Sequence, residues 1–285
     1  MAAVNYAESY ERALAQAYPN VLNFGELYNV ANNQVYKFVD SKTIHIPSIS
    51  VSGRKNVNRD AIDGTFQRNV DNSFETKTLT FYREWSTSID PADVLDTNMI
   101  LTIQNATKVF NEEQKFPEKD AYTISKIYAD WTAEGKQADK TALTVDNVLI
   151  VFDKLMEAMD EALVPSNGRL LYVTPAVKTL LKQASQIGLS RNVQTGANTI
   201  NRVVDRLDEI KLISVPSFLM KTAYNFTTGF KPSDSAKQIN LFLVHPSAIL
   251  TPSKYAFVGM EAPAAGTKGD YIYYEKEYSD VFILN

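Results

Sequence analysis

The chain contains no cysteine and only two histidines among its 285 residues. The lack of cysteine excludes disulfide scaffolds, thiolate zinc sites, iron–sulfur clusters and a cysteine nucleophile. His45 and His245 are too few for a histidine-rich metal site, so carboxylates would have to bind any metal. Because a lone histidine is weak evidence for general base catalysis, both are interpreted as structural residues.

Glycine is scarce as well, at 11 residues, and neither G-x-x-x-x-G-K-[ST] nor G-x-G-x-x-G occurs. The G-x-S-x-G motif of serine hydrolases is also missing. Asp153, Glu157, Asp160 and Glu161 recur at helical spacing, which is more typical of a solvated helix face than of a paired-carboxylate site. We therefore expect no enzyme, no catalytic residue, no metal and no cofactor. A carboxylate-dependent hydrolase is the enzymatic alternative.

The chain has no large net charge and no long run of apolar residues. The net charge of −4 argues against a dedicated nucleic-acid binder, because phosphate contacts need clustered Lys and Arg, but it is compatible with a container for DNA. No segment approaches the roughly 20 apolar residues of a membrane span. Residues 1–10 include an acidic residue and no apolar run, unlike a secretory signal. These features predict a soluble chain that is made in the cytoplasm.

What the sequence does contain is an unusual extended unit. Ile44 to Val51 predicts a strand, with Pro47 favouring an edge position, and Phe74 to Trp85 predicts a second strand. The 22 residues between them, Ser52 to Ser73, are mostly polar. Such a long connection is uncommon in compact domains, and an isolated hairpin is marginally stable in water. A neighbouring copy of the chain could supply the missing contacts.

The remaining elements mix helices with strands, which indicates an α+β architecture. Asp90-Pro91 predicts the start of a long helix that runs to Phe110, and Pro117 the start of a second that Gly135 ends. The other expected elements are an amphipathic helix over 6–17, a helix over 145–163 capped by Thr144, a strand over 170–173, a helix over 175–183, a polar loop over 192–201, a strand or hairpin over 203–215, a strand over 239–244 and an aromatic-rich C-terminal segment.

Two motifs carry a family resemblance. The first is FYREWSTSIDPADVLDTN, from Phe81 to Asn98, and the second is FPEKDAYTISK, from Phe116 to Lys126. In this order, behind a long hairpin, they resemble the major capsid proteins of tailed bacteriophages, in particular phages of Gram-positive hosts. The resemblance implies the Hong Kong 97 type of shell fold, an α+β fold. It implies an N-terminal arm over 1–41, an extended β-hairpin loop over 42–88, a peripheral domain with the spine helix over 89–143 and 245–285, and an axial domain over 144–244.

By the same resemblance, the expected function is a major capsid protein that self-assembles into hexamers and pentamers. These would form an icosahedral or prolate head that encloses double-stranded DNA without sequence-specific binding. The expected partners are further copies, a separate scaffolding protein and a portal, with no membrane, and the expected location is the virion, after assembly in the host cytoplasm. No fused scaffolding segment is expected. An encapsulin-like nanocompartment shell, with the same fold, is the alternative.

Charged residues between the two strands are the expected inter-subunit contacts. The positive and negative charges there are nearly balanced. Such a balance is more typical of a contact in which opposite charges align two protein subunits than of a phosphate-binding surface. These residues are Arg54, Lys55, Arg59, Asp60, Asp63 and Arg68.

Overall fold

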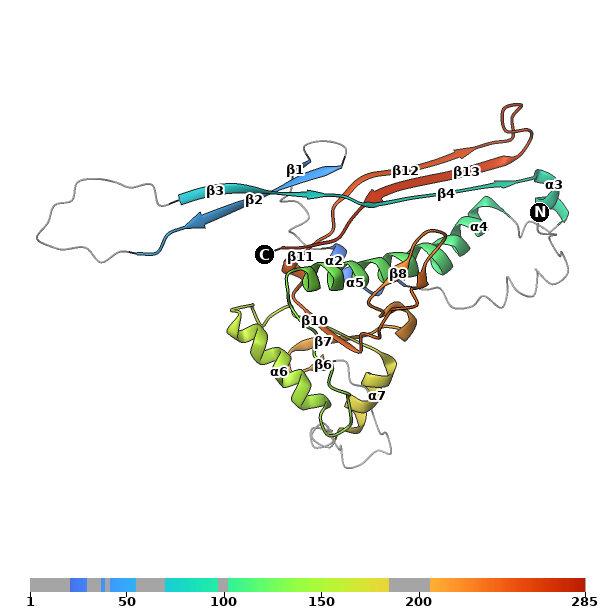
Figure 1. The fold of residues 1–285 in the computed structure, drawn as a ribbon. Helices are drawn as coiled ribbons and strands as arrows, with labels where there is room; N and C mark the ends of the chain where they lie inside the picture. The colour runs from blue at the N-terminus through green and yellow to red at the C-terminus, as the bar shows by residue number, and fades with distance from the viewer. Residues whose placement is uncertain are drawn as a thin grey trace, which may run out of the picture.

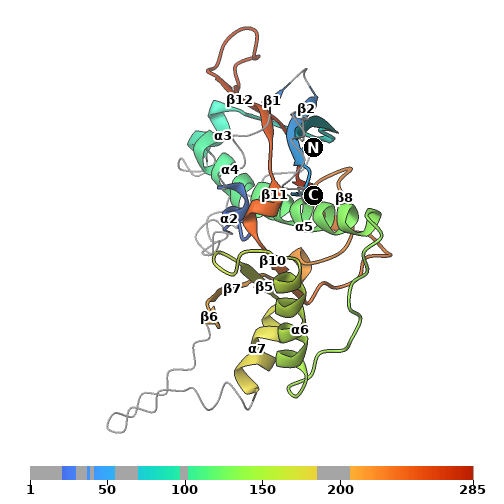
Figure 2. The same cartoon turned by 90° about the vertical axis from the view of Figure 1, so that its left-hand side faces the viewer.

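A computed structural model shows an extended upper layer of strands, a long helix beneath it, and a wedge-shaped lower unit (Figures 1 and 2). It describes residues 21–29, 37–38, 42–54, 70–96, 102–184 and 206–284. The helix expected over 6–17 and the loop expected over 192–201 lie outside these residues.

The expected hairpin forms one end of the upper layer (Figure 1). Strand β2 (Thr43–Val51) pairs antiparallel with β3 (Val70–Thr78) along its full length, which confirms the predicted hairpin. The second strand starts at Val70 and not at Phe74, so the expected connection Ser52–Ser73 is wrong at its last four residues. The short strand β1 (Lys37–Phe38) pairs with β2 at His45 and Ile44 only. Pro47 lies beyond that pairing, where β2 borders the sheet among the described residues, as a strand proline requires.

The prediction of one strand from Phe74 to Trp85 is wrong. Strand β3 ends at Thr78, and β4 (Phe81–Ile89) belongs to a second sheet of order β12-β13-β4, with β12 at Ser253–Glu261 and β13 at Tyr271–Ser279. The break falls at Leu79, which is 1% exposed and packs with Ile44, Leu250 and Phe282. Burial of this side chain turns the backbone from one sheet into the other.

The long helix lies further along the chain than expected. Helix α3 (Pro91–Asp96) begins where predicted, with the Asp90 carboxylate accepting from Ala92 N at 2.8 Å, but the single helix expected to run to Phe110 is interrupted at Thr102, whose backbone is extended. Helix α4 (Ile103–Phe110) is capped by Thr102 and continues through a π turn (Asn111–Lys115) into α5 (Phe116–Ala133). The predicted start of a helix at Pro117 is confirmed to within one residue, but this helix continues from α4 and is not a separate one. The register changes where Phe116 N bonds to Asn111 O, next to a proline that has no N–H to place in the ladder.

The lower unit is a four-stranded sheet of order β10-β5-β7-β6, with two helices on one face. Helix α7 (Pro175–Gln183) and strand β5 match the predictions, and the segment expected as a strand or hairpin forms the β6–β7 hairpin. Helix α6 (Val148–Glu161) starts later than predicted, because residues 145–147 form a turn in which Asn147 Oδ1 accepts from Thr144 N. The strands are β5 (Leu170–Val173), β6 (Arg206–Leu207), β7 (Ile210–Ser214) and β10 (Leu241–Val244).

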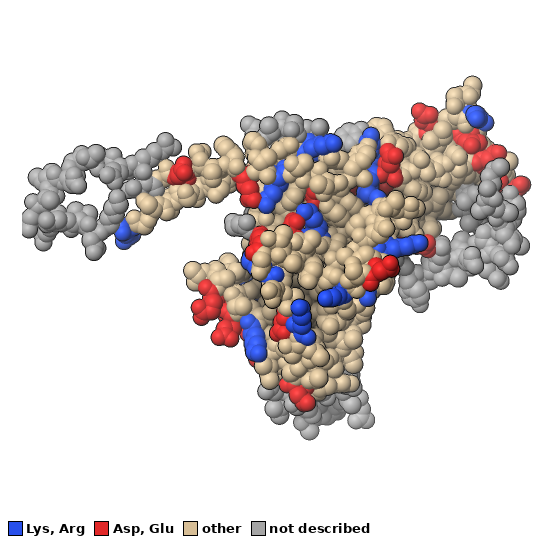
Figure 3. Space-filling view, viewed as in Figure 1, with Lys and Arg blue, Asp and Glu red and all other residues tan. Residues whose placement is uncertain are grey.

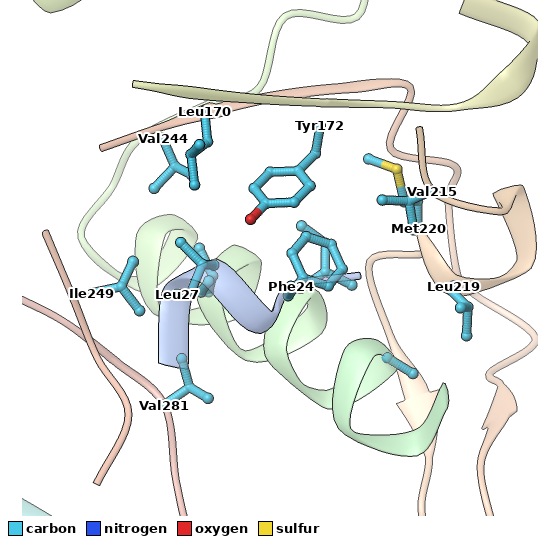
Figure 4. Packing of buried hydrophobic residues seen from close by; sticks show 13 residues of the cluster. Phe24, Leu27, Leu170, Tyr172, Val215, Leu219, Met220, Val244, Ile249 and Val281 are labelled. Atoms are coloured by element: carbon cyan, nitrogen blue, oxygen red, sulfur yellow. The ribbon is translucent and has the colours of Figure 1, made fainter. Parts of the chain in front are cut away.

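The main core lies between the other face of this sheet and helix α5 (Figure 4). Helix α2 (Gly25–Tyr28) is wedged into it, because Phe24 and Leu27 are fully buried and the Phe24 ring lies 4.5 Å from that of Tyr172. The remaining elements are β8 (Tyr224–Asn225), β9 (Lys231–Pro232), β11 (Ile249–Leu250), β14 (Phe282–Ile283) and the 3₁₀ turns Ser217–Leu219 and Pro246–Ala248.

Candidate assembly surfaces

Of the six sequence-predicted contact residues, the structure describes Arg54. Arg54 follows β2 and is exposed. The other five, Lys55, Arg59, Asp60, Asp63 and Arg68, lie outside the described residues. Their role in subunit contact stays a prediction.

One face of the hairpin is apolar and exposed. The register pairs Pro47 with Phe74, Ile49 with Asn72 and Val51 with Val70, so these residues share a face. Ile49 is 72% exposed, Val51 70% and Phe74 60%. We call this set, Pro47, Ile49, Val51, Val70, Asn72 and Phe74, the hairpin face.

The opposite face of the same strands is polar, with Ser48 paired to Ser73 and Ser50 to Asp71. In Figure 3 the hairpin projects from the body, with few charged side chains on it. An amphipathic ribbon normally buries its apolar side against a core, and among the described residues nothing covers this one. The hairpin face therefore has the properties of a contact surface.

A buried carboxylate fixes the base of the hairpin. Asp280 is 1% exposed and its Oδ2 accepts from Thr80 N at 2.6 Å and Thr80 Oγ1 at 3.0 Å. Its Oδ1 accepts from Tyr122 OH at 2.7 Å and from Val281 N at 2.8 Å. These bonds join helix α5, the C-terminal segment and the turn between β3 and β4, so they set the direction in which the hairpin leaves the body.

A row of side-chain pairs joins the long helix, which comprises α4 and α5, to the sheet β12-β13-β4. At one end the Trp85 ring stacks on Phe110, with centroids 3.9 Å apart. Further along, Lys115 pairs with Glu275 at 3.1 Å and Lys119 with Glu277 at 2.6 Å. These contacts make the helix and sheet one platform.

Arg83 and Glu118 form an ion pair within this row. Burial raises the pKa of the Glu118 carboxyl, and the charge of Arg83 opposes that rise. The Arg83 guanidinium also donates to Phe226 O at 2.6 Å and to Gly229 O at 3.3 Å, so it ties the platform to the loop after β8.

Sequence reasoning missed strand β12, which borders this sheet. Val258 is 62% exposed and Met260 is 64% exposed. Both lie on the same face of the sheet as the residues paired with them, Glu275 and Tyr273. The run from Tyr255 to Met260 carries aromatic and β-branched residues and could have indicated a strand. Its exposure could not be read from the sequence, because it follows from the position of β12 at the sheet edge.

A second buried carboxylate holds the segment before the hairpin. Asp120 on α5 is fully buried and accepts from Asn23 N at 2.9 Å, Asn23 Nδ2 at 2.8 Å and Phe24 N at 3.0 Å. Burial raises the pKa of Asp120 to about 6, against the effect of these hydrogen bonds. The bonds hold the two residues that precede α2 and attach this segment to the long helix.

The two histidines and one acidic residue of α6 make structural contacts. His45 lies beside the Phe74 ring at 5.8 Å, and His245 caps a 3₁₀ turn through Ser247. The four acidic residues of α6 are exposed, as the solvated-face interpretation predicted, and Asp160 pairs with the buried Arg169 at 2.6 Å. Among the described residues, no group of three or more metal-ligating side chains gathers, and no helix combines the length and hydropathy that a bilayer-spanning segment needs.

Comparison with known proteins places the fold. No family model and no curated protein sequence matches the chain. Solved structures do match. The mature capsid of bacteriophage PhiM1 aligns with a TM-score of 0.60 and 12% identity, covering 85% of this chain and 78% of that one. The capsid of cyanophage P-SCSP1u gives a TM-score of 0.59 and 13% identity, covering 95% and 87%.

A structure from Mycobacterium phage Che8 gives a TM-score of 0.55 and 10% identity, covering 95% of this chain and 90% of that one. The fold is therefore that of phage capsid subunits. More particularly, it is the Hong Kong 97 type of α+β shell fold that the sequence motifs implied.

Proposed function

We propose that this chain is the major capsid protein of a tailed bacteriophage. It assembles into hexamers and pentamers that form an icosahedral or prolate head around double-stranded DNA. The shared fold supports this proposal, and the hairpin face is the observation that carries it. A shell subunit needs surfaces that are completed by its neighbours, and the hairpin exposes an apolar face on an arm that its own body does not cover.

The proposed parts follow the sequence prediction with one change. The N-terminal arm covers 1–41, the axial domain 144–244, and the peripheral domain, which gains residues 79–88, covers 79–143 and 245–285. The extended loop, expected to run to residue 88, ends at Thr78 in this proposal. The reason is that β4 pairs with β13 from Phe81 to Ile89 and so belongs to the peripheral sheet.

The energetics fit a shell built from repeated small contacts. Full burial of one large apolar side chain contributes about 1.5–3 kcal/mol, and Ile49, Val51 and Phe74 are already partly covered, so each adds about 1–2 kcal/mol. A single such contact is weak. In a closed symmetric shell every subunit makes several contacts at once, which stabilises the whole assembly.

The proposed protein is not an enzyme, and its location is the virion, after assembly in the host cytoplasm. A scaffolding protein and a portal are the proposed partners during assembly. The net charge of −4 suits a container that encloses DNA without gripping its sequence. An encapsulin-like compartment, which has the same fold, is the alternative function. The contents of the particles distinguish the two functions. A capsid contains nuclease-protected DNA, whereas a compartment contains an enzyme cargo.

The test compares single substitutions on the two faces of the hairpin. Ile49→Asp and Phe74→Asp place a charge on the hairpin face, whereas Ser48→Asp and Ser73→Asp place the same charge on the polar face of the same strands. All four sites are exposed, so the subunit should fold in each variant with unchanged circular dichroism.

Negative-stain electron microscopy then measures assembly. We expect shells from the unchanged chain and from the two serine variants, and free subunits or capsomers from I49D and F74D. Normal shells from both I49D and F74D would remove the hairpin face from the proposal.

A further inference from the structure

The turn between α6 and β5 carries the one Asn-Gly pair of the sequence, Asn167-Gly168, and both residues are exposed. An asparagine side chain followed by glycine can react with its own backbone, because no Cβ hinders the approach of the glycine nitrogen. A Cβ added at Gly168 would meet, among the described residues, one atom closer than 4 Å, which is His245 Nε2 at 3.6 Å. The turn therefore leaves open the space that this reaction needs.

The Gly168 amide is available as the reacting group. Among the described residues it donates no hydrogen bond. Its φ of 87° is a conformation that glycine adopts without strain. The next residue, Arg169, has a buried side chain that donates to Pro165 O at 3.0 Å and pairs with Asp160 at 2.6 Å. These bonds hold the turn at its buried end, while Asn167 and Gly168 stay exposed.

His245 contacts the peptide group that would react. Its Nε2 lies 3.1 Å from Asn167 O, and its Nδ1 accepts from Ser247 N at 3.2 Å. A backbone N–H can only donate, so Nδ1 carries no proton, and the proton of the ring is on Nε2. The imidazole therefore donates to the carbonyl oxygen of the Asn167–Gly168 peptide. A donor at this oxygen stabilises the negative charge that develops on the peptide group as Gly168 N loses its proton.

We propose that Asn167 is a self-modification site, activated by His245, at which the chain converts a side-chain amide to a carboxylate. Gly168 N bonds to Asn167 Cγ, the bond from Cγ to Nδ2 breaks, and the proton from Gly168 N leaves with Nδ2 as ammonia. Water then opens the cyclic imide at either of its carbonyl carbons, which gives aspartate or isoaspartate. Water is the co-reactant, so the reaction takes place in a single chain and does not depend on the proposed shell function.

The products change the turn permanently. Both place a negative charge beside His245, and isoaspartate also lengthens the backbone between α6 and β5 by a methylene group. Because Arg169 donates to Pro165 O within the same turn, the longer backbone should weaken the attachment of α6 to the sheet. The modified fraction therefore records how long the folded chain has existed.

Peptide mapping by mass spectrometry measures the conversion of Asn167 in the purified folded chain over time, and an isoaspartate methyltransferase labels the isoaspartate product. Asn72 gives the internal reference, since it is also exposed and is followed by the small residue Ser73, but lies in strand β3. We expect Asn167 to convert at least about tenfold faster than Asn72, because Ser73 has a Cβ and its backbone is part of a β-ladder. A rate at Asn167 no higher than that at Asn72 would overturn the site.

Two substitutions of His245 separate activation from a structural role. His245→Asn keeps an oxygen that can cap the 3₁₀ turn but is too short to reach Asn167 O, whereas His245→Gln keeps a donor near the position of Nε2. We expect H245N to slow conversion of Asn167 about three- to tenfold, the factor that one neutral hydrogen bond provides, and H245Q to retain most of the rate. The rate at Asn72 should be unchanged in both variants. An unchanged rate in H245N, or equal losses in H245N and H245Q, would overturn the role of His245.

Discussion

The Asp280 carboxylate accepts a hydrogen bond from the backbone amide of Thr80 at 2.6 Å, across 200 residues of sequence. Thr80 lies at the point where the chain leaves the hairpin and enters the second sheet. Because Asp280 also accepts from Tyr122 on the long helix, one side chain links the hairpin, the sheet and the helix. The position of the hairpin relative to the body therefore depends on this carboxylate.

Replacing this carboxylate should loosen the hairpin base. Asp280→Asn keeps the shape of the side chain but replaces one accepting oxygen by a donating NH₂ group, which faces donors on every side. We expect a loss of about 2–3 kcal/mol in the free energy of unfolding, measured by urea denaturation. We also expect faster hydrogen exchange at the Thr80 amide.

The exposed Asp153 on α6 gives the control for this change. Asp153→Asn should alter the free energy of unfolding by less than about 0.5 kcal/mol. Unchanged exchange at Thr80 in D280N would show that the hairpin base is held by packing of Leu79 and its neighbours instead.

A second prediction concerns pH and the buried Asp120. Burial raises the pKa of this carboxyl from 3.8 to about 6, so the folded chain binds the proton more tightly than the unfolded chain. The stabilising contribution of Asp120 is therefore fully present below about pH 4 and is lost as pH rises through about 6. Integrated over this window, the change is about 3 kcal/mol.

Asp120→Asn removes the titrating group and serves as the reference. The free energy of unfolding, measured in urea from pH 3 to pH 8, should fall for the unchanged chain relative to D120N by about 3 kcal/mol, with most of the change before pH 6. Above pH 7 the two curves should run parallel. Parallel curves over the whole range would show that the three N–H donors from Asn23 and Phe24 cancel the effect of burial on the pKa of Asp120.

Local signals explain which elements the sequence predicts correctly. The bounds of helix α7 are predictable from the sequence because Thr174 caps it and Pro175 occupies its first turn. The hairpin is predictable because two extended segments, rich in β-branched or aromatic residues, flank a long polar stretch. In both cases the information lies within a few residues of the element.

Distant contacts explain the failures. The residues from Phe74 to Trp85 have continuous strand propensity, and the break at Leu79 and Thr80 depends on partners at Leu250, Asp280 and Phe282. The helix continues past Pro117 because its side chains pair with strand β13, which lies far along the chain. The edge position of β12, and with it the candidate contact surface, is a property of sheet order.

The last prediction concerns Tyr172, whose hydroxyl oxygen is buried without a hydrogen-bond partner among the described residues. Figure 4 shows that this oxygen points into the apolar cluster near Phe24 and Leu27. A buried unpaired hydroxyl loses its hydration without compensation, and the same burial raises the pKa of the phenol. Tyr172→Phe should therefore raise the free energy of unfolding, by about 1 kcal/mol.

Tyr122→Phe is the matched control, because it removes the same atom from a tyrosine whose hydroxyl donates to Asp280 at 2.7 Å. It should lower the free energy of unfolding by about 1–2 kcal/mol, since Asp280 then loses a donor. Urea denaturation of the two variants under identical conditions gives opposite signs if the core is as described. A loss in Y172F as large as that in Y122F would mean that the hydroxyl of Tyr172 has a bonding partner, such as an ordered water held between α2 and the sheet.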